Sequence, residues 1–164
     1  MAAKKVLEWK FESINTANAT VTNARIALDL ANNELAEIHK VMSSIQPGGF
    51  AAGGADDIIA MTMALSTDPN VINDPAVAAN NDDAEWFYLH RHQLQAELTT
   101  EGASQHKHND EKSVDFNPPI LVGTDVGLVV HNDATITCDS WVRVFFTRRK
   151  ATANELTQIL LKRR

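Results

Sequence analysis

The chain has 164 residues, of which 44% are hydrophobic and 22% charged, and its formal net charge at pH 7 is −6. This length suits a single domain with a core of its own, and the composition excludes a disordered chain. No run of 18 apolar residues occurs, so we expect no membrane span. The start lacks the continuous apolar stretch of a signal peptide. The only cysteine, Cys138, excludes an intrachain disulfide, and we expect a reducing compartment.

Charge is distributed unevenly along the chain. From Arg148 to the end there are six basic residues and one acid, Glu155, a net charge of +5, whereas residues 1–147 carry nine basic and twenty acidic residues, a net charge of −11. Such a tail can bind nucleic acid or an acidic neighbouring copy, although positive charge also suits a helix end for dipole reasons alone. The basic residues are Arg148, Arg149, Lys150, Lys162, Arg163 and Arg164.

Alternation of apolar and polar residues predicts strands through the first half. Residues 4–13 place Leu7, Trp9 and Phe11 on one face, which is typical of a half-buried strand. The segment Glu34 to Gln46 fits both a helical stripe and a buried strand, and its position after a strand and an Asn-Asn pair favours a strand. Further strands are expected at residues 20–30, 57–66 and 86–98.

Polar segments separate the strands of the second half. Residues 67–83 predict a connecting loop with at most one helical turn, and Thr99 to Asp115 predicts a protruding loop that Pro118 and Pro119 end. The closing strands are expected at residues 120–122, 127–131 and 135–147.

The segment Asp139 to Arg164 predicts a strand that leads into a short helix. Thr152 followed by Glu155 is a capping box, in which each side chain satisfies a backbone NH at the helix start. The apolar residues that follow at helical spacing are Leu156, Ile159 and Leu160.

Seven to nine predicted strands with turn-rich connections indicate an all-β fold, a single jelly roll or β-sandwich. We expect one domain, residues 1–164, with a C-terminal α-helix over residues 152–163. A parallel α/β sheet does not fit the pattern, because no regular helices separate the strands.

The last strand has large side chains on both faces. Val142, Val144 and Phe146 form its core face, and Trp141, Arg143 and Phe145 line the opposite face. Because that second face also carries large apolar groups, it must be covered by the terminal helix or by another subunit. Trp, Arg and Phe are also enriched at protein interfaces. The residues expected at a subunit interface are Trp141, Arg143, Phe145, Leu156, Ile159 and Leu160.

Four of the six histidines fall in two His-x-His pairs, His90 with His92 and His106 with His108. Strand alternation puts both members of a pair on one face, where imidazoles can bind a metal. Residues 89–97 resemble the first motif of the cupin family, which implies a metal site at His90, His92 and Glu97. The glycine that the motif has before the first histidine is Ala84 here, and no clean second motif occurs. The alternative is that these are ordinary strand and loop residues.

No catalytic or nucleotide-binding motif occurs, so we expect no enzyme and no cofactor. The closing pattern, Pro-Pro-Ile-Leu-Val-Gly at residues 118–123 and Trp-Val-Arg-Val-Phe-Phe from residue 141, is similar to small jelly-roll structural proteins of viruses of microbes. The resemblance implies a virion protein, assembled in the host cytoplasm, whose partners are copies of itself, other virion proteins and, through the tail, nucleic acid. The remaining alternatives are a cupin-like metal protein and a monomeric β-sandwich that binds sugar or belongs to a tail or receptor-binding structure.

Overall fold

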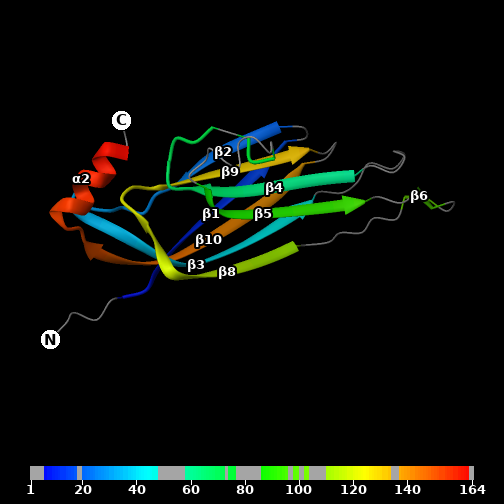
Figure 1. Cartoon of the computed structure of the whole chain (residues 1–164). Helices are drawn as coiled ribbons and strands as arrows, with labels where there is room; N and C mark the ends of the chain where they lie inside the picture. The colour runs from blue at the N-terminus through cyan, green and yellow to red at the C-terminus, as the bar shows by residue number, and fades with distance from the viewer. Residues whose placement is uncertain are drawn as a thin grey trace.

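The computed structural model describes residues 6–17, 20–47, 58–72, 74–76, 86–95, 98–99, 102–103, 110–133 and 137–162. Figure 1 shows its elements. They are β1 (Glu8–Thr16), β2 (Thr20–Ile26), β3 (Glu34–Pro47), β4 (Ile58–Ser66), β5 (Trp86–Gln95), β6 (Leu98–Thr99), β7 (Gly102–Ala103), β8 (Asp110–Val122), β9 (Val126–Asp133), β10 (Cys138–Lys150) and α2 (Ala153–Lys162). Within these ranges, no helix has the length and apolarity that a bilayer crossing requires.

Two four-stranded antiparallel sheets make up most of the described chain. Sheet A has the strand order β1-β10-β3-β8, sheet B has the order β2-β9-β4-β5, and β6 pairs with β7 separately. Strands from the start of the chain pair with strands from its end in reverse order: β1 pairs with β10, β2 with β9, β3 with β8 and β4 with β5. Two packed sheets wound in this way form a jelly roll. The predicted all-β fold class is therefore confirmed.

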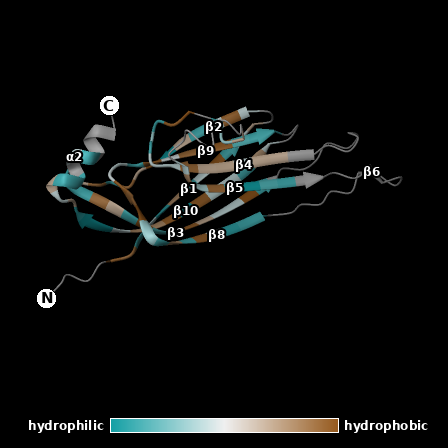
Figure 2. Ribbon diagram, in the orientation of Figure 1, coloured by the Kyte–Doolittle hydropathy of each residue, from teal (hydrophilic) through white to brown (hydrophobic). Residues whose placement is uncertain are grey.

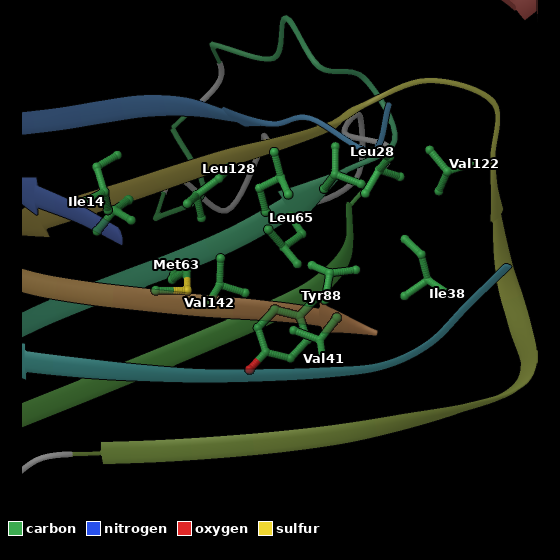
Figure 3. Packing of buried hydrophobic residues seen from close by; sticks show 14 of the residues in the cluster. Ile14, Leu28, Ile38, Val41, Met63, Leu65, Tyr88, Val122, Leu128 and Val142 are labelled. Atoms are coloured by element: carbon green, nitrogen blue, oxygen red, sulfur yellow. The ribbon is translucent and has the colours of Figure 1, made fainter. Parts of the chain in front are cut away.

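The core lies between the two sheets. Figure 2 shows hydrophobic residues along β9 and β10, which occupy interior positions of their sheets, and Figure 3 shows side chains of both sheets meeting in the core. The fully or almost fully buried members include Ile26, Leu28, Ile38, Val41, Ile45, Met61, Met63, Leu65, Leu128, Val142, Val144 and Phe146. Alternation supplies this inner layer, because every second residue of each strand points toward the opposite sheet.

The outer face of sheet B is covered by the chain itself. A Cβ built on Gly127 would lie 2.3 Å from the Asp68 carbonyl oxygen and 2.7 Å from Val71 Cγ1, so the segment after β4 lies directly on β9. Ala64 and Val129 are paired across the ladder on the same face and are fully buried. Both faces of sheet B are therefore shielded from solvent around β4 and β9.

The first strand is confirmed, but its apolar face is not in the core. β1 begins at Glu8 and continues to Thr16, three residues beyond the predicted end at residue 13. Ile14 and Thr16 point inward and are buried, whereas Trp9 and Phe11 lie on the opposite, outer face. The alternation correctly predicted that one face is apolar, but it could not tell which face of the sheet that is.

The prediction for residues 99–122 is wrong at two points. β6 and β7 form a short hairpin inside the expected loop, and the last strand before β9 begins at Asp110 instead of residue 120. The sequence of β8 is largely polar because β8 is an edge strand of sheet A with a solvated outer face. It therefore resembles a loop in sequence. Pro118 and Pro119 lie within it, where the ladder with β3 shifts register and prolines are tolerated.

Two further predictions about local structure hold. Residues 34–46 form a strand, β3, which pairs with β10 on one side and β8 on the other. α2 begins at Ala153, and its capping box is formed, since the Thr152 amide donates to Glu155 Oε2 at 2.9 Å and the Glu155 amide donates to Thr152 Oγ1 at 3.4 Å. The strand expected over residues 86–98 ends earlier, at Gln95.

We predict that Gly127→Ala destabilises the fold by about 1–3 kcal/mol, because the new methyl group must displace the Asp68 backbone or the β9 backbone. Chemical denaturation measures this change in the free energy of unfolding. Adding Val71→Ala to Gly127→Ala should restore only part of the stability, since the clash with the Asp68 carbonyl remains. A neutral Gly127→Ala variant would show that this segment does not lie on sheet B.

Candidate functional site

The outer face of sheet A has an aromatic surface where β1 and β10 pair. Trp9 lies opposite Phe145, and Phe11 lies opposite Arg143, so these side chains share one face. Residue alternation adds Trp141 to the same face. We call Trp9, Phe11, Trp141, Arg143 and Phe145 the aromatic face.

Interactions between side chains hold the aromatic face together. The Phe11 and Trp141 rings are stacked, with centroids 6.2 Å apart. The Arg143 guanidinium carbon lies 4.8 Å from the Trp9 ring centroid and 6.0 Å from that of Phe11, a cation–π arrangement. Arg143 Nε is buried and has no hydrogen-bond partner among the described residues. The guanidinium is thus held by the rings, which gives this face a fixed shape.

Two rings of the aromatic face are open to solvent. Trp9 is 56% exposed and Phe11 is 47% exposed, whereas Trp141, Arg143 and Phe145 are half-buried. Contiguous exposed aromatics of this kind mark interaction sites in soluble proteins. Sheet A therefore has an apolar face that the described part of the chain leaves uncovered, in contrast to sheet B.

The same face becomes polar toward its other edge. Along the ladder from β10 to β3, Phe145 lies opposite Lys40 and Arg143 opposite Met42. Lys40 forms a 3.8 Å ion pair with Asp115 of β8, and Glu111 is exposed on that strand. Arg143 and the aromatic rings therefore lie at the β1–β10 side, with Asp139 further along β10, and Glu111 and Asp115 lie at the β8 side.

The structure places the residues predicted for a subunit interface in two regions. Trp141, Arg143 and Phe145 point outward, as expected of that strand face. The other three predicted residues, Leu156, Ile159 and Leu160, belong to α2, and their side chains lie outside the described part of the structure. Figure 1 shows α2 at the end of the sandwich where β10 ends. Trp9 and Phe11 were missed as surface residues because their alternation was interpreted as a core face.

Two of the basic residues at the end of β10, Arg148 and Arg149, are bound to carboxylates of the same chain. Arg148 Nε lies 3.0 Å from Glu8, and its Nη1 donates to the Asp29 carbonyl at 2.7 Å. Arg149 joins β10 to β3 and α2, with Nε 2.9 Å from Glu37 and Nη2 2.5 Å from Glu155.

Lys150 is exposed, the Lys162 side chain lies outside the described residues, and so do Arg163 and Arg164. Arg148 and Arg149 therefore stabilise the junction between β10 and α2, whatever else the tail contacts.

Glu155 is unusually acidic for a half-buried carboxyl group. Hydrogen bonds from the Arg149 side chain and from Thr152 lower the pKa of Glu155 to about 2. The hydrogen bonds to the Glu155 carboxylate raise the pKa of Arg149 in return. One carboxylate thus caps α2 and ties it to the sandwich.

The histidine pair lies in the interior, at the edge where β5 of sheet B faces β8 of sheet A. His90 and His92 share the inward face of β5 and are 2% and 9% exposed. Asp110 Oδ2 lies 3.2 Å from His90 Nε2 and 3.0 Å from His92 Nδ1. Ser43 Oγ lies 2.7 Å from His90 Nδ1 and 2.6 Å from the Tyr88 hydroxyl. These hydrogen bonds connect β3 and β8 with β5 through polar side chains.

The cupin-like metal set is not assembled in the described residues. Glu97, His106 and His108 lie outside them, and the partner of both described histidines is Asp110, which the sequence did not suggest. Within the described ranges, no group of three or more His, Cys, Asp or Glu side chains could hold a metal ion.

No family model matches the chain, and no curated protein matches it. Among solved structures it is similar to the BFDV capsid protein, solved as a 60-mer, with 15% identity over 92% of this chain and 97% of that one, at a TM-score of 0.39. It is also similar to VP1 of the Trichodysplasia spinulosa-associated polyomavirus in complex with sialylated glycooligomers, with 9% identity over 89% and 93%, at a TM-score of 0.35. The same VP1 in complex with the GM1 oligosaccharide, again 9% identical over 89% and 93%, gives 0.32. These similarities are distant, so the jelly-roll assignment rests on the strand order described above.

We predict that Arg149→Gln moves the Glu155 titration midpoint from about 2 toward its ordinary value of 4.5, because the largest cause of the lowered pKa is removed. Since that pKa is lower in the folded state, the contribution of Glu155 to α2 is complete above pH 4.5 and disappears as pH falls toward 2. Carboxyl-carbon NMR measures the midpoint. Arg148→Gln is the matched control and should leave it in place; equal shifts in the two variants would contradict the assigned ion pair.

Proposed function

We propose that this protein is a capsid-type structural subunit that assembles with copies of itself through the aromatic face. The observation that carries the proposal is that the outer face of one sheet is shielded by the chain, whereas that of the other exposes Trp9 and Phe11 around a fixed Arg143. Jelly rolls occur in viral capsid proteins as well as in lectins and cupins. A subunit of this kind needs no catalytic group and resides in the virion.

Burial of the aromatic face gives assembly a driving force. Full burial of a large apolar side chain is worth about 1.5–3 kcal/mol, so covering the exposed half of each ring would contribute roughly 0.8–1.5 kcal/mol. Arg143 already lies against the rings, so little of its side-chain entropy remains to be removed when a partner docks. A fixed aromatic patch with a central arginine has the composition of an interface hot spot.

Charge along the face favours a second copy as the occupant. Arg143 lies at the β1–β10 side and Glu111 and Asp115 at the β8 side of the same sheet. Two copies related by a two-fold axis along the strands would place Arg143 of each over Glu111 and Asp115 of the other, an isologous interface. The acidic body, with −11 over residues 1–147, also offers neighbouring copies a surface for the basic tail.

We further propose that the remaining basic residues of the tail bind genome or the acidic body of a neighbour. The side chains concerned are Lys150, Lys162, Arg163 and Arg164. Arg148 and Arg149 are assigned to the junction instead, because their guanidinium groups bind Glu8, Glu37 and Glu155.

We predict that Trp9→Gln with Phe11→Gln shifts the purified chain toward its single-chain mass of 18.0 kDa without unfolding it, because the rings lie outside the core. Sedimentation velocity measures the mass distribution, and thermal unfolding checks the fold. Ile72→Gln removes a 77% exposed apolar side chain elsewhere and should leave assembly intact. An unchanged assembly in the double variant would exclude the aromatic face as the interface.

We predict that replacing Lys150, Lys162, Arg163 and Arg164 by Gln flattens the salt dependence of binding to a mixed-sequence single-stranded DNA. The log–log slope should fall by about 0.7 for each phosphate that the variant no longer neutralises. Fluorescence anisotropy over a range of salt concentrations measures the slope, and Arg148→Gln should leave it unchanged. If the unaltered chain binds DNA with no salt dependence, or not at all, the tail does not bind nucleic acid.

A further inference from the structure

Several polar side chains between the sheets form one continuous chain of hydrogen bonds, which leads from buried residues to Asp110, whose side chain is 39% exposed. It runs from Tyr88 through Ser43 and His90 to Asp110, and His92 joins it at the carboxylate. Figure 3 shows the Tyr88 ring extending from β5 with its oxygen beside β3. Lys112 of β8 adds a second connection, since its Nζ donates to the Leu89 carbonyl at 2.6 Å. We call the five residues Ser43, Tyr88, His90, His92 and Asp110 the inter-sheet network.

The donors and acceptors that each group offers determine where the protons lie when Asp110 is ionised. A carboxylate only accepts, so His90 Nε2 and His92 Nδ1 both donate to Asp110. A neutral His90 then has an acceptor at Nδ1, which takes the Ser43 hydroxyl hydrogen, and Ser43 Oγ accepts from the Tyr88 hydroxyl. Each of these donors has an acceptor in this arrangement.

An additional proton on either histidine disrupts this arrangement. On His92 it would occupy Nε2, which is buried and has no partner in the described structure. On His90 it would occupy Nδ1, so Ser43 would have to accept there and donate to the Tyr88 oxygen, and the Tyr88 hydrogen would be left without its acceptor. A buried donor without an acceptor costs about 1–3 kcal/mol.

We propose that the inter-sheet network is a proton-operated latch, which holds β5 against β3 and β8 at neutral pH and loosens this edge of the sandwich when the histidines take up protons. The latch acts within one subunit. It therefore goes beyond the proposed assembly function and can be tested whether or not that function holds.

Burial and the groups around His90 act on its pKa in opposite directions, and burial prevails. Burial lowers the pKa of His90, and although Asp110 opposes this, the pKa stays below its ordinary value of 6.5. Lys112 and Tyr88 are the other ionisable groups on the described residues facing His90, and Tyr88 stays neutral because burial raises its pKa. β4 contributes uncharged Met61 and Met63 beside the histidines.

The sign of the pH effect follows from the two lowered pKa values. Between the His90 values in the folded and unfolded states, the unfolded chain binds more protons, so stability falls as pH decreases below 6.5. Burial alone would raise the pKa of Asp110, but hydrogen bonds from His90 and His92 outweigh it and leave it below 3.8. Asp110 therefore stays ionised throughout the pH range in which the histidines respond.

The experiment uses the fact that Tyr88 is the only tyrosine of the chain. Labelling tyrosine at Cζ gives a single NMR signal that reports the hydrogen bond at its hydroxyl. From pH 8 to pH 5 we expect this signal to shift with a midpoint below 6.5, and amide exchange in β5 and β8, corrected for intrinsic rates, to rise on the order of tenfold relative to β1. A Tyr88 signal and exchange pattern that stay constant to pH 5 would overturn the latch.

Variants separate the latch from a general acid response. Ser43→Ala breaks the connection between Tyr88 and His90, so the Tyr88 shift should disappear while the chain stays folded at pH 8. His131→Gln removes a histidine that binds Asp74 elsewhere and should change nothing at Tyr88. A shift that survives Ser43→Ala, or a midpoint that moves on addition of zinc alone, would contradict a latch that responds to protons through this network.

Discussion

Strand β10 has large side chains on both of its faces, and a sheet can shield only one of them with its partner sheet. Val142, Val144 and Phe146 fill the space between the sheets. Trp141, Arg143 and Phe145 point the other way, where β1 adds Trp9 and Phe11. Because β10 lies between β1 and β3 in sheet A, it cannot rotate to bury its second face without breaking both ladders. The aromatic face is therefore a consequence of the strand order, and the part of the chain that the structure describes does not cover it.

Two sets of polar interactions connect the strands of the sandwich at different places. At one end, Arg148 and Arg149 bind carboxylates of β1, β3 and α2, so the strand that supports the aromatic face is anchored where the helix begins. At the β5–β8 edge, Asp110 joins the two sheets through His90 and His92. The first set consists of ion pairs, and the second of hydrogen bonds to one carboxylate. Under the proposed latch, mild acid acts on the β5–β8 edge of the sandwich.

Local pattern predicted most strands, the two-faced nature of β10 and the capping box of α2, since these depend on neighbours within a few residues. It failed where the answer depends on partners far along the chain. Trp9 and Phe11 looked like core residues because alternation does not say what lies opposite, and β8 looked like a loop because an edge strand can be polar. Asp110 is 18 and 20 residues from the histidines it binds, and only strand pairing brings them together.

The central claim is that copies of this chain associate through an uncovered sheet face, and the mass of the purified protein tests it most directly. Sedimentation at micromolar concentration and neutral pH should give species well above the single-chain mass of 18.0 kDa, with the proportion of large species rising with concentration. A single species of 18.0 kDa across the whole concentration range would contradict the claim.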